Sequence, residues 1–186
     1  ALASISYQGN ADFNGSDTLS VVSTDANGAT DTDAVAITVS SVNDGPLNAV
    51  PGAQAVNEDT LLSIGGISVN DVDGNLSTTQ LTVSNGTLTV SLAGGATIGA
   101  GANSSSTLTL SGTQAQINAA LASLSYQGNA DFNGADTLTV VSTDANGATD
   151  SDAVVITVSS VNDGPVNTVP GAQTVNEDTS LSIGGL

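Results

Sequence analysis

The sequence contains no lysine, arginine, histidine, cysteine, methionine or tryptophan among its 186 residues. Its 18 acidic side chains give a formal net charge of −18, and no basic side chain can pair with them. Nucleic-acid recognition needs lysine and arginine to neutralise phosphates, so this composition excludes it. The chain also lacks the basic side chains that bind anionic membranes, and no apolar run reaches the roughly 18 residues of a membrane span.

The same absences argue against catalysis. Histidine, cysteine and lysine supply most general bases and nucleophiles, which leaves only paired carboxylates for chemistry. A glycosidase-like carboxylate pair also needs a cleft lined by aromatic side chains, and two tyrosines and two phenylalanines cannot line one. We therefore expect no enzyme. The lack of cysteine is compatible with a large secreted repeat protein and with a reduced cytosol alike.

An internal repeat organises the chain. Ala1-Leu2-Ala3-Ser4 returns at Ala120-Leu121-Ala122-Ser123, from position 1 to position 120, which is a period of 119 residues. A period this long is a whole domain, since solenoid and propeller units span about 20–50 residues. The Val-Asn-Asp-Gly-Pro tract interrupts two strand-like runs and marks the boundary. It predicts the end of one domain at 1–44, a complete domain at 45–163 and the start of a third at 164–186, as in a segment of a longer array.

Apolar residues make up 39% of the chain and are rich in valine, isoleucine and leucine, which indicates a folded protein. Leu88–Leu92, Leu108–Leu110 and Leu138–Val140 alternate apolar residues with serine or threonine, as half-buried antiparallel strands do. Asn85-Gly86 lies between two such runs and predicts a hairpin with a type I′ turn. Tyr126 and Phe132 are expected to fill the core or plug an end of the domain, and the alternative is a sugar-binding platform.

One segment follows helical spacing instead. Its apolar residues recur at Ile117, Ala120, Leu121 and Leu124, and Thr113 with Gln116 has the spacing of a capping box. We expect a short helix across one end of the domain. Together these patterns predict an all-β fold of tandem Greek-key β-sandwich domains, each with one short helix.

The acids are unevenly placed, since none occurs between Gly74 and Ala130. They gather instead on glycine-containing loops and at the domain ends. Carboxylate and amide oxygens on such loops are the ligands that Ca²⁺ takes. Asx turns that cap their own loops are the alternative reading of each motif alone. An EF-hand is excluded, because Leu76 stands where its glycine belongs and Thr82 where its glutamate belongs.

These residues resemble the bacterial cadherin-like tandem repeats of giant secreted surface adhesins of the RTX type. The resemblance rests on Glu58, the Asp71-Val72-Asp73 loop, the late Asp144 and the Asn162-Asp163 linker, and it covers the full period. It implies a cadherin/Ig-like fold with Ca²⁺ bound at the domain junctions. The implied ligands, with their repeat copies, are Asp12, Asp25, Asn43, Asp44, Glu58, Asp71, Asp73, Asp131, Asp144, Asn162, Asp163 and Glu177. The linker departs by continuing Gly-Pro, and Asp131-Phe132-Asn133 replaces a denser acidic motif, so fewer ions per junction are expected.

The resulting hypothesis is an extracellular, calcium-stiffened extender of an adhesin or surface fibre, serving attachment or biofilm cohesion. Its partners would be neighbouring repeats and, in a fibre, identical chains. A self-assembling filament or sheath is the alternative. A ligand-binding or ice-binding module is the third, suggested by threonine pairs such as Thr87 with Thr89.

Overall fold

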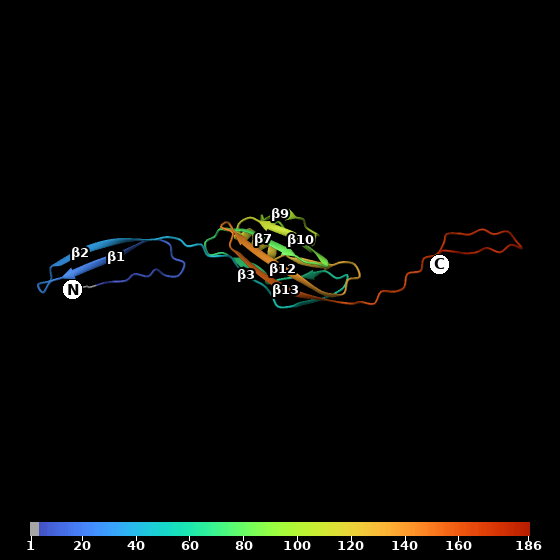
Figure 1. Cartoon of the computed structure of the whole chain (residues 1–186), viewed down its shortest axis with the longest axis horizontal. Helices are drawn as coiled ribbons and strands as arrows, with labels where there is room; N and C mark the ends of the chain where they lie inside the picture. The colour runs from blue at the N-terminus through green and yellow to red at the C-terminus, as the bar shows by residue number, and fades with distance from the viewer. Residues whose placement is uncertain (1–3) are drawn as a thin grey trace.

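The computed structural model describes residues 4–186 and places a folded sandwich between two extended flanking segments (Figure 1). The sandwich contains every element from β3 to β13, residues 47–159. The N-terminal segment carries a hairpin of β1 (Gly15–Thr24) and β2 (Thr30–Val39). In the described chain, residues 164–186 have no regular secondary structure. The first three residues of the repeated tetrapeptide, 1–3, lie outside the described part.

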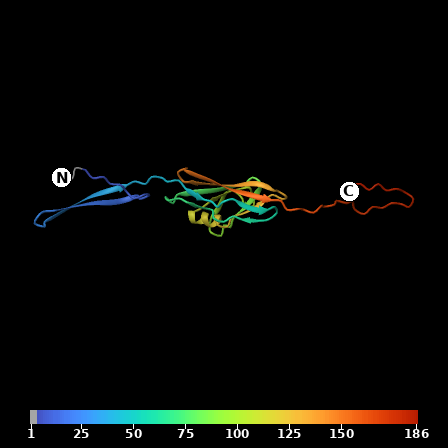
Figure 2. The same ribbon diagram turned by 90° about the horizontal axis from the view of Figure 1, so that it is seen from below.

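Two sheets face each other in the sandwich (Figure 2). The larger has six strands in the order β4-β13-β12-β7-β10-β9, and the smaller has three in the order β5-β11-β8. A short pair, β3 with β6, completes the set. The bounds are β3 Leu47–Ala49, β4 Gln54–Asn57, β5 Leu62–Ser63, β6 Ser68–Asn70, β7 Leu76–Thr82, β8 Gly86–Thr89, β9 Thr97–Gly101, β10 Thr107–Ser111, β11 Ser125–Gly128, β12 Gly134–Asp144 and β13 Thr149–Ser159. The predicted Greek-key β-sandwich is confirmed.

The strand alternation supplies the core. Leu81, Leu108 and Leu138 stand at alternate positions of three neighbouring strands and are fully buried between the sheets. Their strand neighbours on the other face are threonine or glutamine, because successive side chains point to opposite faces of a strand. Tyr126 is fully buried and Phe132 packs against the core, as expected for both.

The predicted helix is present as α1 (Gln114–Leu121). Both halves of the capping box form, because the Gln116 N–H donates to Thr113 Oγ1 and the Thr113 N–H donates to Gln116 Oε1. Ile117, Ala120 and Leu121 face the core and are buried. This is the one helix among residues 4–186, and it is neither long nor apolar enough to cross a membrane.

The predicted hairpin at Asn85-Gly86 is wrong. Strand β7 belongs to the six-stranded sheet and β8 to the three-stranded sheet, so the chain crosses between sheets here. Glycine is required at position 86 because atoms of Tyr126 and Gln127 lie too close to its Cα to leave room for a side chain, and not because of a positive φ. A Cβ at this position would lie 2.4 Å from a ring carbon of Tyr126 and 2.6 Å from the carbonyl oxygen of Gln127. Tertiary packing has therefore overridden a strong local turn signal.

A buried carboxylate fixes this crossing. Asp136 accepts hydrogen bonds from the backbone N–H groups of Ser84 at 3.0 Å and Asn85 at 2.9 Å. It also accepts from the Tyr126 hydroxyl at 3.0 Å and from the Thr137 N–H at 2.8 Å. Burial, together with the Asp136 carboxylate, raises the pKa of the Tyr126 phenol. Four donors thus replace the water that an ionised carboxylate would lose on burial.

The N-terminal hairpin repeats this tyrosine–aspartate arrangement in a solvent-exposed form. Strands β1 and β2 pair in the register of β12 and β13 one period earlier, with Gly15 opposite Val39 as Gly134 is opposite Val158. The Tyr7 hydroxyl donates to Asp17 at 2.8 Å, although both residues are exposed. The pair therefore forms locally, and only the complete domain buries it.

Replacing Asp136 with Asn should lower the free energy of unfolding by about 2–3 kcal/mol, because the new amide nitrogen faces N–H donors in a buried site. Denaturant unfolding followed by circular dichroism measures this. The matched control is Asp17→Asn, which changes the exposed copy of the same pair and should stay within about 0.5 kcal/mol of the parent. Equal losses in the two variants would contradict the assigned role of the buried network.

Candidate metal centre

Acidic and amide side chains gather at both ends of the sandwich. The upstream cluster consists of Asn43, Asp44, Asp71, Asp73, Asn75, Asp144 and Asn146. The downstream cluster consists of Glu58, Asp59, Asp131, Asn133 and Asp163. Each cluster joins a segment that leads into or out of the sandwich to loops of the sandwich itself.

In the upstream cluster, the loop between β6 and β7 folds around Asp71. Its Oδ1 accepts hydrogen bonds from the N–H groups of Asp73 at 3.1 Å and Asn75 at 3.4 Å. The Asp71 N–H donates to Gln114 Oε1 at 2.9 Å, so the first residue of α1 positions the loop. Asp71 is buried, and Asp73 extends to the exposed side of the loop.

Asp144 caps the turn between β12 and β13. Its Oδ1 accepts from the N–H groups of Asn146 at 2.9 Å and Ala148 at 2.7 Å, and its Oδ2 accepts from the Asn43 amide at 2.7 Å. The Asn43 amide, with the backbone donors of the turn, holds the pKa of Asp144 below its ordinary value. Asp144 is therefore ionised at neutral pH and turned toward the linker.

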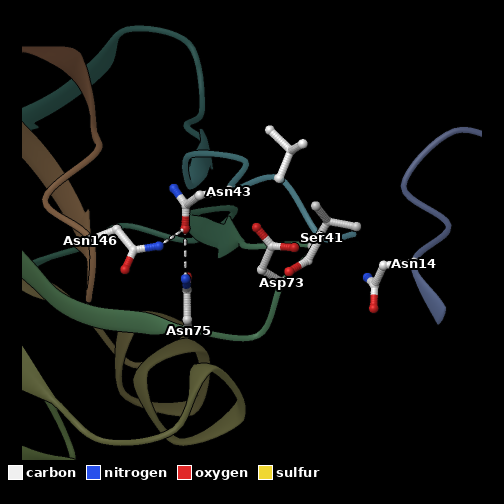
Figure 3. A pocket seen from close by; sticks show the side chains of 8 residues that line it. Asn14, Ser41, Asn43, Asp73, Asn75 and Asn146 are labelled. Atoms are coloured by element: carbon white, nitrogen blue, oxygen red, sulfur yellow. Dashed lines mark hydrogen bonds between the residues drawn. The ribbon is translucent and has the colours of Figure 1, made fainter. Parts of the chain in front are cut away.

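The linker closes the cluster. The Asp44 N–H donates to Asp73 Oδ2 at 2.7 Å. Figure 3 shows the amides of Asn75 and Asn146 converging on the side-chain oxygen of Asn43, with Asp73 beside them. A cleft of about 360 Å³ opens here, lined in part by Asn14, Asn43 and Asp73.

Asp12 lines a second cleft of about 290 Å³ together with the linker residue Asp44 and with Asp73. The structure thus brings Asp12, Asn43, Asp44, Asp71, Asp73 and Asp144, six of the ligands that the resemblance implies, to one end of the sandwich.

Three carboxylates converge in the downstream cluster. Asp59, Asp131 and Asp163 each present an oxygen within 4.8 Å of the other two, and all three are exposed. They come from the turn after β4, the turn before β12 and the segment after β13. Asp59 and Asp131 have φ values of 58° and 57°, in the left-handed region that aspartate tolerates better than most residues.

Glu58 differs from its neighbour Asp59, because its carboxylate accepts hydrogen bonds inside the domain. It is buried, and its two oxygens accept from the Val161 N–H at 2.5 Å and the Asn133 amide at 3.2 Å. Both contacts hold the segment that carries Asp163 and the turn that carries Asp131. The resemblance names Glu58 as a ligand and omits Asp59, although the same Asn-Glu-Asp tract holds both. The positive φ of Asp59, which sequence does not report, is what turns it toward the cluster.

Of the remaining predicted ligands, Asp25 and Glu177 lie apart from these clusters, whereas Asn162 adjoins Asp163 in the linker. Asp25 caps the exposed turn of the N-terminal hairpin, where it accepts from Asn27 and Ala29 N–H groups at 2.9 Å each. The Asn162 amide donates to the carbonyl of Asp163 at 3.3 Å. Glu177 is exposed in the segment 164–186.

The 119-residue period relates the two clusters. Asp12 and Asp44, at the upstream end, are the copies of Asp131 and Asp163, at the downstream end. The linker residue Asp44 of the upstream cluster therefore corresponds to Asp163 of the downstream cluster, and Asn43 corresponds to Asn162.

The donor set is suited to a hard divalent cation. It contains only carboxylate and amide side-chain oxygens on loops, with no thiolate or imidazole, which fits Ca²⁺ rather than a softer transition metal. No basic side chain exists in the chain to neutralise these acids. At neutral pH the clustered carboxylates therefore repel one another unless a cation bridges them.

Comparison with known proteins gives two partial likenesses. The family model for the Protein GAMETE EXPRESSED 2 (GEX2) domain matches residues 64–153, a stretch inside the sandwich. Among solved structures, the fibronectin(III)-like modules of Clostridium thermocellum CbhA are similar at 14% identity, over 83% of this chain and 68% of that chain, with a TM-score of 0.37. No curated protein matches. The two-sheet fold is evident from the strand order itself.

Replacing Asn43 with Ala should raise the pKa of Asp144 toward its ordinary value of 3.8, because it removes the amide that donates to the ionised form. Because the pKa of Asp144 is lower in the folded state than in the unfolded state, its carboxylate stabilises the fold at pH values above the unfolded-state pKa. This stabilisation is lost as the pH falls through the folded-state pKa. Carboxyl ¹³C NMR titration in chelator measures the shift. An unchanged Asp144 pKa in the variant would contradict the contact.

Replacing Asp163 with Asn should weaken Ca²⁺ binding at the downstream cluster by about tenfold or more, since one of three converging charges is lost. Isothermal titration calorimetry measures the affinity. The control is Asp178→Asn, because Asp178 is the repeat copy of Asp59, with a φ of 60°, and lies in the exposed C-terminal segment. It carries the same charge change outside the cluster and should leave the affinity unchanged.

Proposed function

We propose that the chain is a structural extender of an extracellular adhesin or surface fibre, and that Ca²⁺ bound at its domain junctions makes the array rigid. The observation that carries the proposal is the convergence of Asp59, Asp131 and Asp163 within 4.8 Å beside the segment that leaves the sandwich. A cation bound there links the body of one domain to its linker. The upstream cluster supports the same arrangement at the junction that precedes the sandwich, where the linker Asn43-Asp44 meets the loops of the sandwich.

Rigidity follows from where the ligands lie. Without a cation, the linker meets the upstream end of the sandwich through a few hydrogen bonds, such as Asp44 N–H to Asp73. The carboxylates around it repel one another. A bound Ca²⁺ replaces this repulsion with attraction among groups of two domains and the linker, which restricts their relative rotation.

The strand order supports a mechanical role. The segments that enter and leave the sandwich lie at its opposite ends (Figure 1). Strand β4, near the entry, pairs in parallel with β13, the last strand, from Gln54 opposite Ile156 to Asn57 opposite Ser159. Tension along the array would load these hydrogen bonds in shear, so that several must break together. Glu58 lengthens the pairing through its N–H to the Ser159 carbonyl at 2.8 Å.

Extension and not catalysis is also what the composition favours. The array offers no histidine, cysteine or lysine for acid, base or nucleophilic work. The matched family model names a gamete-expressed protein and not a bacterial surface protein, so the proposal depends on the site and not on that match. The extracellular location is part of the proposal, because the weak loop sites of extracellular modules need Ca²⁺ of about 10⁻⁴–10⁻³ M.

Saturating Ca²⁺ should raise the melting temperature of the chain by roughly 10 °C relative to the same protein in chelator. The reason is that a Ca²⁺ concentration a hundredfold above Kd stabilises the folded state by about 2.7 kcal/mol. Small-angle scattering should show a stiffer particle in Ca²⁺. Differential scanning calorimetry and scattering on the same samples measure both effects. Identical melting temperature and scattering in Ca²⁺ and in chelator would overturn the proposal.

The double variant Asp71→Ala with Asp73→Ala removes the upstream loop ligands and should abolish the stiffening at that end, while the core stays folded. The control is Asp31→Ala with Asp33→Ala, which removes the same charge from a pair with the same spacing on the exposed strand β2. Equal loss of stiffening in both would indicate a general charge effect and not a site.

A further inference from the structure

The outer face of the six-stranded sheet is free of charge in a chain of net charge −18. Cross-strand partners share a face of the sheet. Asp136 is opposite Ile156, and Asp152 is opposite Val140, and both apolar partners are fully buried. These acids therefore lie on the inner side of the sheet.

The outer side carries hydroxyl, amide and small apolar groups instead. One row across the strands runs Thr139, Thr82 and Thr107, and the next runs Val141, Gln80 and Thr109. In the described strands β7, β10, β12 and β13, no residue at an outward position is acidic. We call this surface the neutral face.

The other copy of the repeat keeps the same division. On the exposed hairpin, Asp17 is opposite Ile37 and Asp33 is opposite Val21, so these acids again occupy the inner side. Four of the positions that differ between the copies lie on the outer side, and each exchanges one small neutral residue for another. They are Ser16 for Ala135, Ser20 for Thr139, Thr32 for Ser151 and Ala36 for Val155.

We infer that the neutral face is a contact surface for a second copy of this chain, packed face to face. Two polyanions without any basic side chain repel wherever their carboxylates approach, so copies can meet only where neither carries charge. Threonine hydroxyls both donate and accept hydrogen bonds, which makes the face complementary to itself. A basic partner would be drawn to the acidic ends of the sandwich and not to this surface.

The contact is weak for a single domain and grows along an array. Four strands about 4.8 Å apart, each about seven residues long where they lie side by side, offer roughly 500 Å² of face. A stable interface buries about 800 Å² per partner. Repeats in series bring further faces into contact at a high effective concentration, so association strengthens with the number of repeats. The inference goes beyond the proposed function and does not depend on where Ca²⁺ binds.

Sedimentation velocity on the whole chain tests it, at low and at high protein concentration, in Ca²⁺ and in chelator, at about 0.15 M and about 1 M salt. We expect reversible self-association of the parent in Ca²⁺ and at high salt. Gln80→Glu adds a negative charge to the middle of the neutral face without changing its shape, and should weaken association by about tenfold or more. Val141→Glu provides a second charge on the same face.

The matched control is Gln173→Glu, in the exposed C-terminal segment, which makes the same substitution and gives the same net charge as Gln80→Glu. It should associate like the parent. A parent that stays monomeric under all conditions, or equal behaviour of the two glutamate variants, would overturn the inference. Calorimetric titration of the same samples with Ca²⁺ separates the two proposals. If Gln80→Glu weakens self-association but the protein binds no Ca²⁺, only the proposal of Ca²⁺ at the domain junctions is contradicted.

Discussion

The absence of any positively charged side chain governs where each carboxylate of this protein can lie. A buried acid must be matched by N–H, amide or hydroxyl donors, and Asp136, Asp71, Asp144 and Glu58 all are. Every buried side-chain nitrogen and oxygen among residues 4–186 has a hydrogen-bond partner. These acids hold together the inter-sheet crossing, the loop after β6, the last hairpin turn and the exit from the sandwich.

The acids that remain exposed are confined to places where a cation or water can reach them. Asp59, Asp131 and Asp163 meet at the downstream end, and Asp44 and Asp73 meet at the upstream end. The broad face of the large sheet is left neutral. This division gives the molecule charged ends and an uncharged flank.

Local sequence predicts some elements well because their determinants lie within a few residues. The capping box of Thr113 and Gln116 places the start of α1, and the alternation around Leu108 and Leu138 places two core strands. The Asn85-Gly86 prediction failed because a hairpin signal is local, whereas the actual crossing is held by Asp136 and Tyr126 from strands far along the chain. Sequence does not distinguish Asp59 from Glu58 for a related reason, since which of two adjacent acids faces a partner depends on backbone dihedrals.

The sequence alone determined the turn at Asn57–Thr60, the strand periodicity and the pairing of the last two strands. The turn at Asn57–Thr60 reappears at Asn176–Thr179 outside any sandwich, with φ values of 58° and 60° at Asp59 and Asp178. The hairpin of β1 and β2 likewise forms without a facing sheet. Only the tertiary structure decided which acids meet. Asp59, Asp131 and Asp163 are far apart in the chain, and packing of the two sheets brings their loops to one end, because no local interaction can close so long a loop.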